Sequence, residues 1–367
     1  MTIKKIEVFR AEIPLETPFV ISLGAITELN QIIVKVSDDA GNVGWGEAAA
    51  SKRILGEDSE TVKAAIDLFA PGLLGEDPLR LERLVGIMDE TLHRNTAAKA
   101  GLEIALHDLV GNIIGVPLWK FLGGSREVSV ETDYTVTIDE PSVMAEKAKE
   151  LVDQGFREIK VKVGQNPEED VTRLVEIREA VGEDTALRID ANQGWSRQEA
   201  VYALTEMEDL DIQFAEQPIK AGDIDGLKFV RNKVSVPVMA DETVHSPKDA
   251  IDVIKKDATD YINIKLMKAG GFWKAKKIAA IAEASEVKCM VGGMVGTDVL
   301  GTAAVHLAGA VENIVFRDLD MGTSITKPLI KKGGSRLEVN MRTLPEKPGL
   351  GIEEINEDLL EEVNSYT

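Results

Sequence analysis

The chain lacks most features that mark secreted and membrane proteins. It contains one cysteine, Cys289, which has no partner for an internal disulfide, and this favours a reducing, cytoplasmic location. No apolar run reaches the ~18 residues that a membrane helix needs. The first residues, MTIKKIEVFRAEI, alternate apolar and polar side chains and lack the continuous apolar segment of a signal peptide. We therefore expect a cytoplasmic protein with no membrane partner.

Clusters of basic residues are also missing. The 367 residues include 42 lysines and arginines against 63 acids, for a net charge of −21, and no dense Lys/Arg run occurs. Nucleic-acid binders usually concentrate positive charge on one face, so we expect no nucleic-acid partner. The acidity favours a well-solvated surface and says little about a reaction.

The first third of the chain combines two periodicities. Ile32, Val34 and Val36 occupy every second position, as in a strand, and the turn-forming run Asp38–Asn42 follows them. Farther along, Ala97–Gly111 places its apolar side chains at helical spacing. We predict an α+β domain over residues 1–125.

The next part is a repeat of β-rich runs and helical stretches. Helix starts carry cap signals, such as Ser246 followed by Pro247. This alternation predicts an α/β fold, a (β/α)₈ barrel of the TIM type, as the catalytic domain over residues 126–344. A doubly wound open sheet is the main alternative, but it would be expected to carry a Gly-rich nucleotide loop, which is missing. The predicted strands are 128–135, 159–163, 187–190, 212–216, 237–240, 261–264, 288–291 and 313–316.

Residues 345–367 form a separate acidic tail. The spacing of Ile352, Ile355, Leu359, Leu360 and Val363 predicts an amphipathic helix. We expect this segment to pack back on the N-terminal domain, so that both ends of the chain build one capping domain.

Three carboxylates stand at matching places in successive repeats. Asp190 ends LRID, Glu216 ends FAE and Asp241 ends VMAD, 26 and 25 positions apart. Each would project from the carboxyl end of its strand, which is the active-site face of such a barrel. One such acid alone would more often cap a helix, but three close anions repel each other unless a cation lies between them. Oxygen ligands of this kind suit Mg²⁺.

Lysines flank these carboxylates. Lys160 and Lys162 share one face of the second barrel strand, and Lys265 ends the sixth. Lys162 and Lys265 would therefore approach the metal from opposite sides. We expect a lysine beside a dication and a second lysine to have a lowered pKa. The alternative is that these lysines only neutralise the three acids.

The combination fits the removal of a proton next to a carboxylate. Loss of such a proton creates an enediolate with two anionic oxygens, which Mg²⁺ stabilises. Two lysines on opposite faces of one carbon can take the proton from one side and return it from the other.

These motifs give the chain a clear family resemblance. It resembles the enolase superfamily, in particular the muconate-lactonising-enzyme subgroup, through AAKAGLEIALHDLVGNIIGVPLWKFLGG, KVK, DANQGW, EQP, ADE and NIKLMKAGG. The superfamily is also the general example of Lys or His bases working with Mg²⁺. The resemblance implies one Mg²⁺ per subunit and a homo-oligomer. It implies Asp190, Glu216 and Asp241 as ligands, Lys162 and Lys265 as the acid/base pair, and Lys160 as a partner of the substrate carboxylate.

A further motif points to a dipeptide substrate. Asp318 and Asp320 follow the eighth strand and resemble the Asp-x-Asp signature of dipeptide epimerases, which holds the α-ammonium of the substrate. We include Thr135, Gly24 and Ile54 among the substrate-binding residues. Gly24 stands where Ala-Glu epimerases often have an arginine, so we expect apolar dipeptides in preference to Ala-Glu.

Other activities remain open at this point. An N-acylamino-acid racemase, an o-succinylbenzoate synthase or a muconate-type cycloisomerase would share the barrel, the acids and the lysines. These substrates have no use for an ammonium clamp, which favours the epimerase. A non-catalytic binding barrel could dispense with both lysines. The roles of Gly296 and Asp298, after the seventh strand, are open as well.

Overall fold

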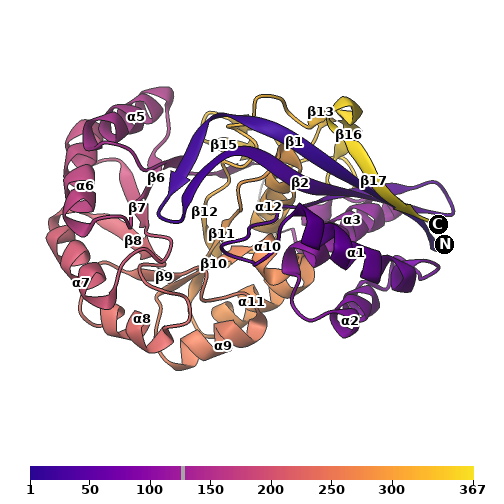
Figure 1. Ribbon diagram of the computed structural model, residues 1–367, viewed down its shortest axis with the longest axis horizontal. Helices are drawn as coiled ribbons and strands as arrows, with labels where there is room; N and C mark the ends of the chain where they lie inside the picture. The colour runs from indigo at the N-terminus through magenta and orange to yellow at the C-terminus, as the bar shows by residue number, and fades with distance from the viewer. Residues whose placement is uncertain (125–128) are drawn as a thin grey trace.

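A long N-terminal hairpin reaches across the mouth of a parallel barrel (Figure 1). The computed structural model describes residues 1–124 and 129–367. The hairpin joins β1 (Ile3–Ile21) to β2 (Gly24–Asp38). Its tip is fixed to the barrel, because the carbonyl of Val20 accepts a hydrogen bond from Ile138 N at 3.1 Å and Ser22 Oγ donates to the Asn192 carbonyl at 3.1 Å. The hairpin therefore covers the end of the barrel where the candidate residues lie.

The hairpin belongs to an antiparallel sheet with the order β17-β1-β2-β3. Ile32, Val34 and Val36 are fully buried in β2, as their alternation predicts. The predicted helix Ala97–Gly111 lies within α3 and is buried on all sides. Gly44 and Gly46 permit this contact, because a Cβ at either position would collide with the backbone of α3. The remaining elements are β3 (Val43–Ala48), α1 (Ser59–Leu73), α2 (Leu81–Thr91), α3 (Thr96–Ile114), α4 (Leu118–Leu122) and β17 (Glu361–Tyr366).

The predicted C-terminal helix is wrong. Residues 345–367 instead form β16 (Ile352–Ile355), the short 3₁₀ turn η2 (Glu357–Leu359) and β17. Two short strands separated by a turn place their apolar residues at irregular intervals that resemble a helical period. β17 pairs antiparallel with β1, from Ile6 opposite Tyr366 to Arg10 opposite Glu361, and this pairing overrides the helical pattern.

The predicted barrel is confirmed. Among the described residues its sheet has eight parallel strands in sequential order from β5 to β12. The strands are β5 (Tyr134–Val136), β6 (Glu158–Lys162), β7 (Ala186–Asp190), β8 (Ile212–Glu216), β9 (Val238–Ala240), β10 (Tyr261–Lys265), β11 (Lys288–Gly292) and β12 (Ile314–Arg317). The helices are α5 (Pro141–Gln154), α6 (Pro167–Val181), α7 (Arg197–Glu206), α8 (Ile224–Arg231), α9 (Pro247–Lys255), α10 (Leu266–Ala269), α11 (Phe272–Ala284) and α12 (Asp298–Ala310), with a 3₁₀ turn η1 (Glu208–Leu210).

The first strand of the barrel is shorter than predicted. Of the expected run 128–135, residue 128 and the domain boundary at 125/126 lie outside the described residues. The rest is divided between β4 (Ser129–Glu131) and β5, because β4 pairs with β15 (Met341–Thr343) instead of a barrel strand. β15 also pairs with β14 (Leu337–Glu338), and β13 (Ile330–Gly333) pairs with β16.

The eighth strand departs from the repeat. In the described part of the chain no helix separates β12 from β13. The ends of the barrel sheet meet next to this strand, where Asp133 N donates to the Arg317 carbonyl at 3.3 Å and Leu319 N donates to Thr132 Oγ1 at 2.8 Å. This junction places the Asp318–Asp320 segment beside the first barrel strand.

A buried arginine, Arg188, lies in the barrel interior two residues before Asp190 on β7. Arg188, opposite Lys160 in the β6–β7 register, makes ion pairs of 2.8 Å with both Asp133 and Glu158. Its guanidinium also lies 5.5 Å from the ring centroid of Phe214 and 5.2 Å from that of Phe316. A buried charge with this many partners holds its neighbours in one arrangement, because breaking any pair would leave an unpaired ion.

Within the described residues, no helix has both the length and the apolar character needed to cross a lipid bilayer.

A buried acid joins the tail to the N-terminal sheet. Asp108 on α3 accepts hydrogen bonds from Trp45 N at 2.8 Å and from Leu350 N at 2.6 Å. Burial raises its pKa from 3.8 to about 7, although these donors oppose the shift. The native state thus favours the protonated acid.

We expect this acid to make stability depend on pH. The contribution of Asp108 protonation to the free energy of unfolding is complete below pH 3.8 and is lost as the pH rises through about 7. Relative to Asp108→Asn, the wild type should lose up to a few kcal/mol of unfolding free energy over this window. Urea unfolding of both proteins at several pH values measures the difference, and a wild-type advantage that grows with pH would contradict the expectation.

Candidate active site

The candidate residues lie at the carboxyl ends of five neighbouring strands. Lys162, Asp190, Glu216 and Lys265 are the last residues of β6, β7, β8 and β10, and Asp241 follows β9 directly. Lys162 is opposite Asp190 in the register, and Asp190 is opposite Glu216. Because all strands are parallel, these ends meet at one edge of the barrel, as the sequence spacing predicts.

The three carboxylates form a compact, buried group. One oxygen from each of Asp190, Glu216 and Asp241 lies within 4.8 Å of the others, and all three side chains are fully buried. Both Asp241 oxygens and Glu216 Oε2 accept no hydrogen bond from any residue that the structure describes, although lysines pair with them ionically. Closely spaced oxygens with unused lone pairs fit a hard divalent cation such as Mg²⁺.

Lys160 lies within this group. Its Nζ is 2.7 Å from Glu216 Oε2, 3.2 Å from Asp190 Oδ2 and 2.7 Å from Asp318 Oδ2. Burial lowers the pKa of this ammonium, but the three carboxylates raise it well above its ordinary value. Lys160 is therefore a permanent cation that links Asp318 to the acidic group.

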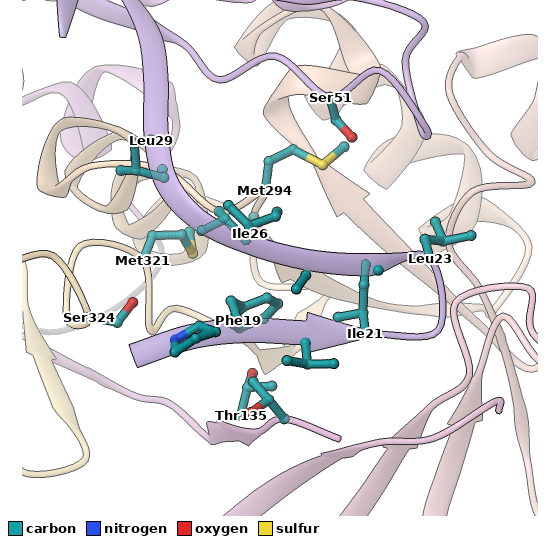
Figure 2. A pocket seen from close by; sticks show the side chains of 18 of the residues that line it. Phe19, Ile21, Leu23, Ile26, Leu29, Ser51, Thr135, Met294, Met321 and Ser324 are labelled. Carbon is teal, nitrogen blue, oxygen red and sulfur yellow. The ribbon is translucent and has the colours of Figure 1, made fainter. Parts of the chain in front are cut away.

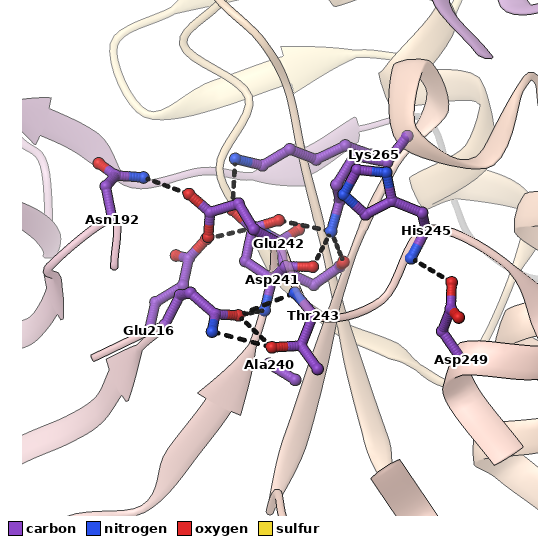
Figure 3. Close-up of polar contacts among 12 residues, drawn as sticks. Asn192, Glu216, Ala240, Asp241, Glu242, Thr243, His245, Asp249 and Lys265 are labelled. Carbon is purple, nitrogen blue, oxygen red and sulfur yellow. Dashed lines mark hydrogen bonds and ion pairs between the residues drawn. The ribbon is translucent and has the colours of Figure 1, made fainter. Parts of the chain in front are cut away.

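Lys162 and Lys265 approach from opposite sides. Lys162 Nζ lies 2.6 Å from Asp190. Lys265 Nζ lies 2.8 Å from Asp241, and Figure 3 shows these two residues. β6 and β10 are separated in the sheet by β7, β8 and β9, so the two amines face each other across the acids. The ring of Phe19, on the hairpin, lies 5.9 Å from Lys162 Nζ and covers it.

Burial and neighbouring charges shift the pKa values of the carboxylates and of Lys265 in different directions. Burial raises the pKa of Asp190, but Lys162 and Lys160 lower it to about 2. Burial and the charge of Asp190 raise the pKa of Glu216 to about 7. Burial lowers the pKa of Lys265, but Asp241 and Glu216 raise it above its ordinary value. In this arrangement the neighbouring carboxylates outweigh desolvation, and the lowered pKa expected for Lys265 beside a dication stays a prediction.

Several residues that contact the carboxylates were not predicted from the sequence. Lys268 Nζ pairs with Asp241 Oδ1 at 2.5 Å and donates to the Asn263 carbonyl at 3.0 Å, while Asn263 Nδ2 donates to Glu216 Oε1 at 2.7 Å. Asn263 could have been found, because it lies two residues before Lys265 on the same face of β10. The buried Glu242, which accepts from Asn192 Nδ2 at 3.2 Å, gave no such signal (Figure 3). His245 lies in the loop between β9 and α9.

A cavity of about 1140 Å³ opens above this group. Lys162 and Lys265 line it, whereas the three carboxylates and Lys160 lie outside its lining. Figure 2 shows the apolar side chains of the hairpin beside Met294 and Thr135 of the barrel. The hairpin side chains labelled there are Phe19, Ile21, Leu23, Ile26 and Leu29.

The other predicted substrate residues line the same cavity. Asp318 and Asp320 are both in the lining, and Asp320 Oδ2 accepts from Thr135 N at 3.1 Å. Burial raises the pKa of Asp318, but Lys160 lowers it overall, whereas burial and Asp318 raise the pKa of Asp320. Ile54 and Gly24 also line the cavity.

Gly24 has a neighbour that the sequence did not indicate. Its φ is +124°, and a Cβ there would collide with the guanidinium of Arg53. Arg53 comes from the second capping loop, lines the cavity and makes no ion pair or hydrogen bond with side chains in the described ranges. The guanidinium of Arg53 thus places a positive charge beside Gly24, where the first capping loop has no basic residue of its own.

The loop after β11 answers one open question. Asp298 turns away from the cavity and accepts hydrogen bonds from Leu329 N at 3.1 Å and Ile330 N at 2.9 Å, whereas Gly296 is part of the lining. Asp298 therefore fixes the segment that precedes β13.

Fold and site together define the class. A parallel barrel, capped by an α+β unit and holding carboxylates and lysines at its strand ends, is an enolase-type arrangement. The family model for the mandelate racemase / muconate lactonizing enzyme N-terminal domain matches residues 4–123, and the enolase C-terminal domain-like model matches residues 143–359. The chain belongs to this mandelate racemase / muconate lactonizing enzyme family of the enolase superfamily.

Relatives of known activity extend over nearly the whole chain. It is 42% identical to an L-Ala-D/L-Glu epimerase from Clostridium acetobutylicum over 97% of this chain and 100% of that protein. It is also 42% identical to a hydrophobic dipeptide epimerase from Enterococcus faecalis over 96% of this chain and 99% of that protein. Both relatives are epimerases, and the chain is an isomerase.

Solved structures are similar to the same extent. The substrate-liganded L-Ala-D/L-Glu epimerase from Bacillus subtilis has a TM-score of 0.94 and 41% identity, covering 97% of this chain and 99% of that one. The Enterococcus faecalis dipeptide epimerase, complexed with Mg and the dipeptide L-Leu-L-Tyr, also has a TM-score of 0.94 and 41% identity, covering 96% and 100%.

Proposed function

We propose that the chain is a Mg²⁺-dependent dipeptide epimerase that inverts the Cα of the second residue of an L,L-dipeptide. The observation that carries the proposal is the placement of Lys162 and Lys265 on opposite sides of one acidic group, in a cavity that also exposes Asp318 and Asp320. The epimerase relatives support it. Lactonising and N-acyl substrates have no ammonium group for the two aspartates to bind.

The lysines perform the proton transfers. One neutral lysine takes the Cα proton from one face of the substrate, and the protonated lysine on the other face returns a proton, so the carbon is inverted. The hairpin, with Phe19 above Lys162, excludes water from this exchange.

Asp190, Glu216 and Asp241 would hold the metal. A bound Mg²⁺ supplies positive charge that stabilises the oxygens of the substrate carboxylate as the Cα proton leaves. Lys160, buried beneath the cavity, adds a fixed positive charge to the same region.

The substrate's two ends would bind at different walls. The α-ammonium would be bound by Asp318 and Asp320 beside β12, because paired carboxylates complement a cation. The side chain of the second residue would contact the two capping loops, which supply Phe19, Ile21 and Ile54. These apolar surfaces favour an apolar second residue.

One observation supports a second candidate, an acidic second residue. The guanidinium of Arg53 beside Gly24 places a cation on the same wall that pairs with no side chain of residues 1–124 or 129–367. If the substrate is acidic, Arg53→Met should lower kcat/KM for L-Ala-L-Glu by about tenfold or more, as loss of a charged hydrogen bond does. If the substrate is apolar, kcat/KM for L-Leu-L-Tyr should change less than about twofold.

Deuterium uptake from D₂O tests the function and the preference together. The purified chain is incubated with pooled L,L-dipeptides and Mg²⁺, and the products are analysed by mass spectrometry and ¹H NMR. We expect deuterium at the Cα of the second residue only. No uptake from any dipeptide, together with uptake from N-succinylamino acids, would replace this proposal with the N-acylamino-acid racemase.

The ammonium site gives a separate prediction. Asp320→Asn keeps the shape of the side chain and its bond from Thr135 N but removes one negative charge. We expect KM for dipeptides to rise about tenfold, because a charged partner is lost, and KM for N-succinylamino acids to change little. Steady-state kinetics with both substrates measure this, and equal effects on the two would exclude the clamp.

The partners and location follow from the same family. We propose a homo-oligomer in the cytoplasm with the dipeptide as its small-molecule substrate and no nucleic-acid or membrane partner. Exposed apolar side chains on the outer surface, such as Leu79 and Phe121, support contact between copies, which light scattering tests. The buried Cys289 has no disulfide partner, consistent with a reducing compartment.

A further inference from the structure

A carboxylate of the capping domain binds the start of a barrel helix. Glu47, on β3, is fully buried and does not line the cavity. It accepts hydrogen bonds from Thr297 N at 2.9 Å, Thr297 Oγ1 at 2.6 Å and Leu300 N at 2.9 Å. These donors belong to the N-cap residue and the first turn of α12, so a side chain of one domain adds to the cap that Thr297 Oγ1 provides by accepting from Val299 N.

The segment held in this way is a wall of the substrate cavity. Residues 293–296, between β11 and Thr297, line the cavity with Met294 and Val295. Gln31 provides a second attachment, because its Nε2 donates to the Val295 carbonyl at 3.1 Å and its Oε1 accepts from Ala50 N at 2.9 Å. The barrel loop is thus fixed to both capping segments that carry the proposed specificity residues.

Glu47 also limits the volume of that wall. A Cβ at Gly296 would approach Glu47 Oε1 to 2.9 Å and Leu300 Cδ2 to 2.8 Å. The carboxylate therefore lies directly behind the lining and leaves no room for a side chain there. Displacement of Glu47 would free the loop to move away from the cavity.

The chain contains a matched feature away from the cavity. Glu103, on α3, caps α11 in the same manner by accepting from Phe272 N and Trp273 N at 2.7 Å each. It is equally buried, and neither Glu103 nor the start of α11 lines the cavity. Both acids fix the capping domain to the barrel, but only Glu47 holds a cavity wall.

We propose that Glu47 is a positioning residue for substrate selection, which holds the loop 293–296 against the capping domain and so defines the space for the second side chain of the dipeptide. The selection part of this inference rests on the proposed function. The positioning part concerns the loop alone.

Amide hydrogen exchange tests the positioning. In Glu47→Gln, we expect exchange of residues 293–301 to rise about tenfold or more, because glutamine offers one acceptor oxygen where the carboxyl group offers two. In Glu103→Gln, the rise should be confined to the start of α11. Thr297→Val, which removes both the hydroxyl donor to Glu47 and the acceptor for Val299 N, should raise exchange at 293–301 as well. Unchanged exchange at 293–301 in Glu47→Gln would overturn the inference.

Competition between pooled dipeptides tests the selection. Glu47→Gln should raise KM for the preferred dipeptide about tenfold, with kcat changed less than about threefold. The variant should therefore discriminate less: the kcat/KM of the preferred dipeptide divided by that of a poorer dipeptide should be smaller than in the wild type. Glu103→Gln should lower thermal stability and leave that ratio unchanged. If Glu47→Gln and Glu103→Gln gave the same kcat/KM ratio between dipeptides, Glu47 would have only a structural role. A wild-type chain that turns over no dipeptide would refute the proposed function, while the exchange experiment would still decide the positioning.

Discussion

Replacement of either Lys162 or Lys265 by methionine should abolish epimerisation, with kcat reduced by about 10²- to 10⁴-fold, the usual contribution of a general acid or base. Methionine keeps the length and apolar stem of the side chain but cannot bind a proton. Because inversion needs one base on each face of the carbon, neither lysine can replace the other. The two amines lie on strands separated by β7, β8 and β9.

The two variants should differ in a partial reaction. Each retains one base, which can still remove and return the proton on its own face without inversion. In D₂O, Lys162→Met should exchange the Cα proton of one epimer only, and Lys265→Met that of the other. NMR of separate L,L- and L,D-dipeptides measures this opposite selectivity.

The control is a lysine without contact to the cavity. Lys149 is exposed on α5, outside the cavity lining, so Lys149→Met should keep kcat within about twofold, as surface substitutions usually do. Retained inversion in either active-site variant would exclude a two-base mechanism. Identical exchange of both epimers in one variant would favour a single base that reaches both faces.

The strand ends were predictable because the repeat itself fixes them. In a parallel barrel one βα unit returns the chain to the same edge, so Asp190, Glu216 and Asp241 had to meet once their spacing matched that unit. The lysines of KVK follow from the alternation of a strand. These are local periodicities, which a single sequence contains in full.

Contacts between distant segments were not predictable in the same way. The position of Arg53 over Gly24 depends on how two loops of the capping domain pack, and no periodicity in either loop expresses it. Glu47 reaches α12 across 250 positions of the chain, as its bond to Thr297 records. The prediction of a C-terminal helix is wrong for a related reason. β17 is a strand because it pairs with β1, and the sequence of the tail alone does not contain that information.

Conversion of Glu216 to glutamine should weaken Mg²⁺ binding by about 100-fold or more, since even partners of metal ligands are worth 10- to 100-fold. Glutamine keeps the volume and the acceptor for Asn263 Nδ2 but removes one of three charges that the cation needs. Epimerisation should fall in parallel, and EDTA should abolish the wild-type activity until Mg²⁺ is restored.

Glu242 provides the control for this experiment. It is buried beside Asp241 and bonded to Asn192, but it does not belong to the three-carboxylate group. Glu242→Gln makes the same carboxyl-to-amide change at nearly the same depth, and because Glu242 is not one of the three grouped carboxylates, Mg²⁺ affinity by calorimetry should change less than about tenfold. Equal losses in both variants would mean that total negative charge, and no particular ligand set, holds the ion. A large loss confined to Glu216→Gln would instead identify direct coordination, because the same carboxyl-to-amide change at similar depth would then matter only within the three-carboxylate group.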